Sequence, residues 1–144
     1  MRDLTKSVLT LPWAISMFGV QQVANLVSPG GEQRVAGTAA AFDAVMAAFR
    51  VSKEDPGRKE KIQKAFKSAA ETPLKIAKLA KEVNLLAKEI LEVGNKNAAS
   101  DAKTAIYLSE AAKKSAFANV EINLTYIKDG NFIKKMEKEV ASLK

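Results

Sequence analysis

Apolar positions recur three and four residues apart along most of the chain, which is the spacing of amphipathic helices. Residues 32–50 place Phe42, Met46 and Phe49 on one side of a predicted helix. A longer helical pattern, residues 56–93, carries a stripe formed by Ile76, Leu79, Val83, Leu86, Ile90 and Val93. This stripe predicts packing against another helix with the geometry of a bundle or a coiled coil.

Two more helices are predicted toward the C-terminus. The first begins near Ser100, and because Glu121 is the only charged residue within 115–127, we expect that half to be buried on most sides. A turn follows, and the last helix has an apolar side formed by Phe132, Ile133, Met136, Val140 and Leu143. The whole pattern predicts an all-α protein, an antiparallel helical bundle of long, partly kinked helices.

Local signals predict where the helices end. Asp55, followed by a proline, is typical of an N-cap. Pro73 should kink or restart the helix, and Gly94 fits a C-cap. Ser100 is predicted to be the N-cap of the next helix, with Asp101 complementing the helix dipole in its first turn.

The composition suits one globular, mostly helical domain, with 47% hydrophobic and 27% charged residues among 144. The chain contains no Cys and no His. Disulfides and thiolate sites are therefore excluded, and the commonest general base and metal ligand are absent. Any chemistry would rest on carboxylates, lysines, hydroxyls, amides and backbone dipoles, and we expect neither a metal nor a cofactor.

The chain is basic, with a net charge of +7 and an isoelectric point of about 9.6. Most of the excess consists of lysines in residues 51–100. A solvated helix face is the first interpretation, and attraction of an anionic partner is the second. Nucleic acid is not expected as a partner, because the excess is Lys rather than Arg, aromatic residues are only 6%, and no recognition motif is present.

Residues 1–28 differ from the rest of the chain, because no charged residue occurs between residues 7 and 31. The segment is apolar, but Pro12, Gln21 and Asn25 would need partners inside a lipid bilayer. We interpret 1–28 as an apolar helical segment that is buried or lies in an interface. Contact with a membrane surface is less favoured, and the protein is expected in the cytoplasm. Residues 32–144 form the main helical domain.

Asn119 and Asn123 lie four residues apart and therefore share one face of an apolar helix. Buried amides either cross-link neighbouring helices or line a polar ligand site, and the sequence leaves both alternatives open. The residues from Gly94 to Asp101 join two helices. The helix start near Ser100 could hold an anion or a polarised carbonyl oxygen, although ordinary capping also explains it.

Residues of about 39–140 resemble the cyclodeaminase domain of formiminotransferase-cyclodeaminase and the related bacterial methenyltetrahydrofolate cyclohydrolases. The resemblance is carried by Ala41-Phe42-Asp43-Ala44-Val45-Met46, Ala70-Glu71-Thr72-Pro73-Leu74, Gly94-Asn95-Lys96-Asn97 with Ser100-Asp101, and Asn119-Val120-Glu121-Ile122-Asn123-Leu124. The order and spacing of these pieces agree with the family, and together they are fairly specific.

The resemblance implies a dimer-forming helical fold with a folate site and no metal. It implies conversion of 5-formiminotetrahydrofolate to methenyltetrahydrofolate with loss of ammonia, or interconversion of methenyl- and formyltetrahydrofolate. Asp101 would then be catalytic, and the substrate-binding residues would be Asn95, Asn97, Ser100, Asn119 and Asn123. The tetrahydrofolate derivative is substrate rather than cofactor, and the lysine excess would suit its glutamate tail.

The N-terminal part departs from the family pattern. Family members have a Pro-Gly-Gly-Gly-Ser-like turn and two long Ala-rich helices before the Ala-Phe-Asp segment. Here Glu32 follows Pro29-Gly30-Gly31 directly, the Ala-Phe-Asp segment begins ten residues after Gly31, and Thr38 stands where an Asp is usual. The alternative function is therefore a non-catalytic helical assembly or scaffold protein of this family, which self-associates through residues 1–28.

Overall fold

The computed structural model describes the backbone of residues 31–144 and the side chains of residues 39–144. Its elements are α2 (Gly31–Arg50), α3 (Arg58–Val93), the 3-10 turn η1 (Lys96–Ala98), α4 (Ala99–Leu124) and α5 (Gly130–Leu143). The described residues contain helices and no strand, so the all-α prediction is confirmed. The expectations for residues 1–28, including self-association and membrane contact, lie outside the described residues.

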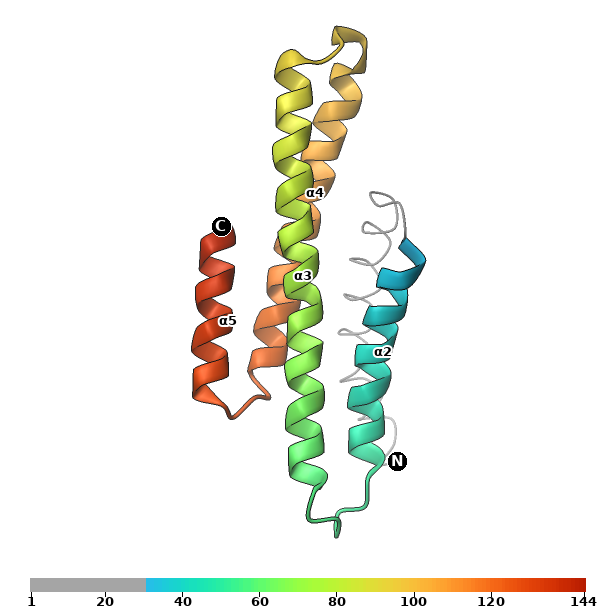
Figure 1. Ribbon diagram of the computed structural model, residues 1–144, viewed down its shortest axis with the longest axis vertical. Helices are drawn as coiled ribbons and strands as arrows, with labels where there is room; N and C mark the ends of the chain where they lie inside the picture. The colour runs from blue at the N-terminus through green and yellow to red at the C-terminus, as the bar shows by residue number, and fades with distance from the viewer. Residues whose placement is uncertain (1–30) are drawn as a thin grey trace, which may run out of the picture.

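The long helices α3 and α4 form an antiparallel hairpin that organises the molecule. Figure 1 shows α2 beside one flank of this hairpin and α5 beside the other, with α3 and α4 extending past both at the end where η1 joins them. We call this extension, residues 85–107, the hairpin tip. The arrangement places the Gly94-to-Asp101 segment far from the end of the bundle that carries the other interhelical loops.

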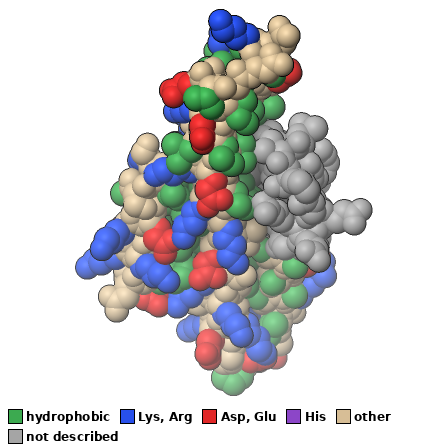
Figure 2. Space-filling view, turned by 45° about the horizontal axis from the view of Figure 1, so that its top comes forward, with side chains coloured by type: hydrophobic (Ala, Val, Ile, Leu, Met, Phe, Trp, Pro, Cys, Tyr) green, Lys and Arg blue, Asp and Glu red, His purple; other side chains and the backbone are tan. Residues whose placement is uncertain are grey.

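Helix α5 is attached to α3 by polar contacts as well as by apolar packing. Lys67 Nζ lies 2.6 Å from Asp129 Oδ2, and Lys78 pairs with Glu139. Lys81 Nζ also donates to the carbonyl of Ser142 at 2.9 Å. On the face shown in Figure 2, basic and acidic side chains are interspersed. Part of the lysine excess of α3 therefore joins helices together.

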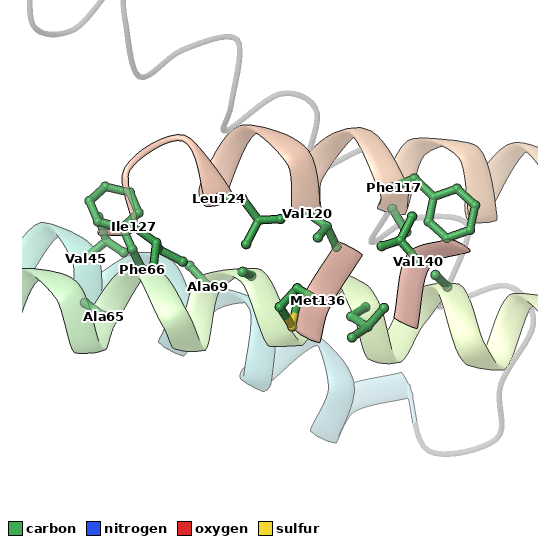
Figure 3. Close-up of a cluster of buried hydrophobic side chains, with 14 of the residues drawn as sticks. Val45, Ala65, Phe66, Ala69, Phe117, Val120, Leu124, Ile127, Met136 and Val140 are labelled. Carbon is green, nitrogen blue, oxygen red and sulfur yellow. The ribbon is translucent and has the colours of Figure 1, made fainter. Parts of the chain in front are cut away.

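The apolar core lies between the lower part of the hairpin and its two flanking helices (Figure 3). Small residues dominate the contact between α3 and α4, and Ala69, Ala77 and Ala116 are fully buried. Aromatic rings close the lower end: Phe66 stacks on Tyr126 with centroids 4.7 Å apart and meets Phe49 edge-on at 5.9 Å. Alanines let the two helix backbones approach closely, and the larger side chains fill the space beside them.

The predicted stripe on α3 does not pack as expected at the hairpin tip. Leu86, Ile90 and Val93 are 58%, 53% and 79% exposed, so the prediction that they pack against a helix is wrong for the described residues. Helix α4 instead contacts the neighbouring face of α3, where Ala80 and Ala87 are buried. The hydrophobic periodicity of the sequence predicted that the bulky apolar residues would be buried. In the structure the two helices pack closely, and the small alanine side chains of α3 allow that close contact.

Two helix starts differ from the sequence prediction. Helix α3 begins after Gly57, and Asp55 accepts a 2.7 Å hydrogen bond from the Gly57 N–H in the preceding turn instead of capping the helix. Helix α4 begins at Ala99, before Ser100, because it directly follows the 3-10 turn η1, whose N-cap is Asn95. Ser100 is therefore not the N-cap. The position of Asp101 in the first turn of α4 is confirmed.

Pro73 and Gly94 test two predictions about helix α3. Helix α3 continues through Pro73 as one element, so no new helix starts there, and Gly94 is its C-cap as predicted.

The second half of α4 is buried on one face only. Ile122 on its other face is 43% exposed and Tyr126, just after the helix, is 56% exposed, so the prediction of burial on most sides is wrong. Among the helices described, none is both long and apolar enough to cross a membrane.

Candidate functional site

The residues predicted to line a site fall into two groups. Asn95, Asn97, Ser100 and Asp101 lie at the hairpin tip, and all four are exposed. The amides Asn119 and Asn123 lie in the second half of α4, and each is 1% exposed. One group is thus open to solvent, and the other is enclosed in the core.

The structure does not bring these two groups together within one chain. Asp101 and Asn119 belong to the same helix and are separated by 18 residues, which corresponds to about 27 Å along its axis. A single small ligand could not contact both groups. The substrate-binding and catalytic roles of all six residues stay predictions, and their geometry has to be considered group by group.

The hairpin tip has an ordered backbone built by short local hydrogen bonds. The Gly94 N–H donates to the Ile90 carbonyl at 2.8 Å, which ends α3. Asn95 Oδ1 then accepts from the Asn97 N–H at 2.9 Å and starts η1. Asp101 follows in the first turn of α4, and no ion pair of the described residues involves its carboxylate. This carboxylate is therefore available to a ligand or a proton.

The side-chain amide of Asn123 is already engaged with the protein. Its Nδ2 donates to the Asn119 carbonyl at 2.7 Å and to the Ala69 carbonyl at 3.2 Å. A primary amide has two hydrogens, so both are directed at backbone carbonyls. Ala69 lies four residues before Pro73, whose missing N–H would otherwise have bonded to the same carbonyl. Asn123 thus links α4 to α3 at the point where the helical hydrogen bonding of α3 is interrupted.

Of the two alternatives for the buried amides, the contacts support helix cross-linking for Asn123. Asn119 Nδ2 donates to the Ser115 carbonyl at 2.9 Å within α4. Every buried side-chain nitrogen or oxygen among the described residues has a hydrogen-bond partner. A substrate role for Asn123 through Nδ2 would therefore require one of its present hydrogen bonds to break.

A third buried amide, Asn84, was not singled out from the sequence. Its Nδ2 donates to Ser109 Oγ at 2.9 Å and to the Ile106 carbonyl at 3.2 Å, and so joins α3 to α4 closer to the hairpin tip. Asn84 is 7% exposed and Ser109 is 2% exposed. The available signal was a lone amide in the apolar run Val83-Asn84-Leu85, the same kind of signal that marked Asn119 and Asn123.

Perturbed carboxyl groups of the described residues lie at ion pairs rather than at the predicted site. Hydrogen bonding from Lys67 lowers the pKa of Asp129, and hydrogen bonding from Lys78 lowers that of Glu139. The Lys61 ammonium likewise lowers the pKa of Asp55. Residues 39–144 contain no group of three acidic, His or Cys side chains placed to hold a metal ion. The chemistry available at the six predicted residues is therefore that of the Asp101 carboxylate, the Ser100 hydroxyl, amides and backbone N–H groups.

Comparison with known proteins places these features in a family. A family model described as formiminotransferase-cyclodeaminase matches residues 33–142, which include all six predicted residues and most of the described fold. The chain belongs to the formiminotransferase-cyclodeaminase family. The family prediction made from the motifs is thereby confirmed.

Individual relatives agree with this family membership. The chain is 38% identical over 107 residues to a methenyltetrahydrofolate cyclohydrolase of Methylorubrum extorquens, covering 72% of this chain and 51% of that protein. It is 28% identical over 109 residues to the formimidoyltransferase-cyclodeaminase of Rattus norvegicus, covering 73% of this chain and 20% of that protein. The chain thus spans about half the length of the bacterial relative and a fifth of the rat protein.

A solved structure has the same arrangement of helices. The crystal structure of formiminotetrahydrofolate cyclodeaminase from Thermotoga maritima matches with a TM-score of 0.67 at 26% sequence identity. The match covers 94% of this chain and 77% of that chain. The family fold is therefore present here in a shorter chain.

Proposed function

We propose that this protein acts in folate one-carbon chemistry as a cyclohydrolase or cyclodeaminase. The observation that carries the proposal is that the family match, residues 33–142, includes the complete hairpin tip with the exposed carboxylate of Asp101. The 38% identity to a methenyltetrahydrofolate cyclohydrolase supports a methenyl- or formyltetrahydrofolate substrate. We place this activity in the cytoplasm.

The chemistry requires proton transfer and positioning rather than a metal. Water adds to the electrophilic methenyl carbon, and a carboxylate can accept the proton that the attacking water loses. Return of that proton to one ring nitrogen lets its bond to the carbon break, which leaves the formyl group on the other nitrogen. Among the six predicted site residues, Asp101 is the one that carries a carboxylate. Asn95, Asn97 and Ser100 are near it along the chain and can orient the pterin or the one-carbon unit through amide, hydroxyl and backbone groups.

A homodimer would complete the site under this proposal. One chain holds Asp101 about 27 Å along α4 from Asn119, so both groups can belong to one site only if different chains supply them. The match to the bacterial cyclohydrolase covers 51% of that protein. A second copy of the chain is the simplest source of the other group of polar residues.

The test is the decay of methenyltetrahydrofolate absorbance with the purified full chain. We expect turnover above the buffer rate and a loss of about 100-fold or more in Asp101→Asn, because a proton-transfer group contributes about 10²- to 10⁴-fold. Glu89→Gln is the matched control, since it removes another exposed carboxylate of the same hairpin. Absence of turnover, or equal rates for Asp101→Asn and the control, would exclude Asp101 catalysis.

The second candidate is a non-catalytic helical assembly protein. It is favoured by the exposed apolar side chains of the hairpin tip, where Leu85 is 58% exposed and Val93 is 79% exposed. Sedimentation velocity can compare the full chain with a chain that starts at Gly31 and with Ile90→Glu. If only the chain that starts at Gly31 forms an assembly of fewer copies than the full chain, residues 1–28 mediate assembly. If Ile90→Glu forms an assembly of fewer copies, the hairpin tip mediates it.

A further inference from the structure

A groove of about 510 Å³ runs between α4 and α5, away from the hairpin tip. Its lining residues are Val120, Glu121, Leu124, Thr125, Ile133, Glu137, Val140, Ala141 and Lys144. Val120, Leu124 and Val140 also belong to the buried core, and Figure 3 shows them within the same cluster. The floor of the groove is therefore apolar and continuous with the core.

One wall of the groove is as long as a three-turn helix. The α5 side extends over the 12 residues from Ile133 to Lys144, about 16 Å, and the α4 side over the six residues from Val120 to Thr125. Glu121, Thr125, Glu137 and Ala141 along its edges are exposed, so the groove is open to solvent along its length. An open trough between two neighbouring helices is the position that a third helix takes in a bundle.

Two of the three charged residues that line the groove are acidic, one on each wall. Glu121 on α4 and Glu137 on α5 take part in no ion pair of the described residues. Glu139, on the other side of α5, does have a lysine partner in Lys78. One cationic side chain, Lys144, lines the groove at the end of α5. The two walls thus present unpaired carboxylates on either side of an apolar floor.

We propose that this groove binds an amphipathic helix of a partner protein, with an apolar stripe flanked on both sides by Lys or Arg. The stripe would cover the floor, and the flanking cations would meet Glu121 and Glu137. Helix-in-groove recognition uses apolar anchors three and four residues apart, and the α5 wall is long enough to contact three turns of a bound helix. This binding is separate from the folate chemistry proposed above and does not depend on it.

The net charge of the chain makes the proposal sharply testable. At +7, the protein as a whole repels a basic peptide. Binding of a basic helix would therefore report a local acidic site. The probe is a labelled, amphipathic Leu/Lys peptide about three turns long, compared by fluorescence anisotropy with a Leu/Glu peptide of identical pattern.

We expect the full chain to bind the Leu/Lys peptide, and the Leu/Glu peptide about tenfold or more weakly. The double variant Glu121→Gln/Glu137→Gln should weaken Leu/Lys binding about tenfold, because two charge pairs are removed. The control Glu60→Gln/Glu89→Gln removes two exposed carboxylates of α3 and should bind like the parent. Equal binding of both peptides, or equal loss in both double variants, would overturn the proposal.

A steric variant provides an independent test. Ala141 is exposed and lines the groove, so Ala141→Trp should abolish peptide binding while the circular dichroism spectrum stays helical. Ala111→Trp, at an exposed alanine of α4 that does not line the groove, should bind normally. Unchanged binding in Ala141→Trp would overturn the proposal. So would a chain that binds no peptide but changes its sedimentation in Ala141→Trp, because the groove would then be a contact between copies.

Discussion

Asn123 on α4 supplies the hydrogen bond that Pro73 removes from α3. Its Nδ2 donates at 3.2 Å to the carbonyl of Ala69, the acceptor that the residue at position 73 would normally satisfy. Both Asn123 and Pro73 are fully buried, so water could not replace this donor. The proline therefore keeps its place inside a 36-residue helix because a side chain of the neighbouring helix completes the backbone.

This relationship predicts strong coupling between positions 123 and 73. Asn123→Ala should destabilise the protein by about 2–4 kcal/mol, because it leaves the Ala69 carbonyl without a donor and creates a cavity. In the Pro73→Ala background the cost should fall by about 1 kcal/mol, since the new N–H can bond to Ala69. A double-mutant cycle of urea unfolding measures this coupling. Strictly additive effects would show that the two residues act independently.

The C-cap of α3 predicts a contrast between two glycines. A Cβ at Gly94 would lie 2.3 Å from the Ile90 carbonyl oxygen, whereas nothing lies within 4 Å of a Cβ at Gly130. Gly94→Ala should therefore cost about 1–3 kcal/mol and shift the start of α4. Gly130→Ala, in the first turn of α5, should stabilise by up to about 1 kcal/mol. Thermal unfolding compares both, and a neutral Gly94→Ala would contradict the close approach.

The Asn84 link predicts stability effects near the hairpin tip. Asn84→Ala should cost about 2–3 kcal/mol because two hydrogen bonds and buried volume are lost. Ser109→Ala should cost about 1 kcal/mol, since the Asn84 amide can still bond to the Ile106 carbonyl. Leu85→Ala is the adjacent control, and because its side chain is 58% exposed the change should stay near 0.5 kcal/mol. If Leu85→Ala proved as costly as Asn84→Ala, the link would not be the stabilising contact.

The ion pairs of α5 predict acid sensitivity. Lysine hydrogen bonds lower the folded-state pKa values of Asp129 and Glu139 from ordinary values of 3.8 and 4.5. Their stabilisation is therefore complete above those ordinary values and is lost as the pH falls through the lower folded-state values. The double variant Asp129→Asn/Glu139→Gln should show a smaller fall in melting temperature on acidification. Asp129 is also the N-cap of α5, where its side chain accepts hydrogen bonds from the N–H groups of Asn131 and Phe132, and Asn can keep this role.

The size of this acid effect should be modest, a few degrees at most, because both pairs are solvent-accessible. Raising the salt concentration should reduce the difference between the parent and the double variant at neutral pH. Glu89→Gln is the control, as no ion pair of the described residues involves Glu89. An identical acid profile for parent and double variant would show that these pairs do not hold α5.

Much of the fold could be predicted from local patterns. The helix of residues 32–50, the C-cap at Gly94 and the amphipathic last helix were all expected, and the structure confirms them. Apolar spacing, turn residues and caps act over a few positions, so they can be interpreted without knowing the neighbours. The family was also predicted, because its motifs combine unusual amides with fixed spacing.

The packing face of α3 could not be predicted in this way. The sequence favoured packing through the stripe that includes Leu86 and Ile90, but α4 packs on the face of α3 that carries Ala80 and Ala87. Which face of a helix is buried depends on how closely the partner backbone can approach, and that is a property of both helices. The start of α4 differed for a similar reason, since Asn95 and η1 lengthen the helical path before Ser100.

For the candidate site too, some features follow from the sequence and others from the tertiary structure. By itself the sequence determined helix type, family membership and the polar residues that stand out against an apolar helix. Only the tertiary structure decided that Asp101 is exposed at a hairpin tip and that Asn123 is bonded to α3. Spacing along a chain specifies neighbours within one helix, whereas burial and hydrogen-bond partners depend on the elements that pack around it.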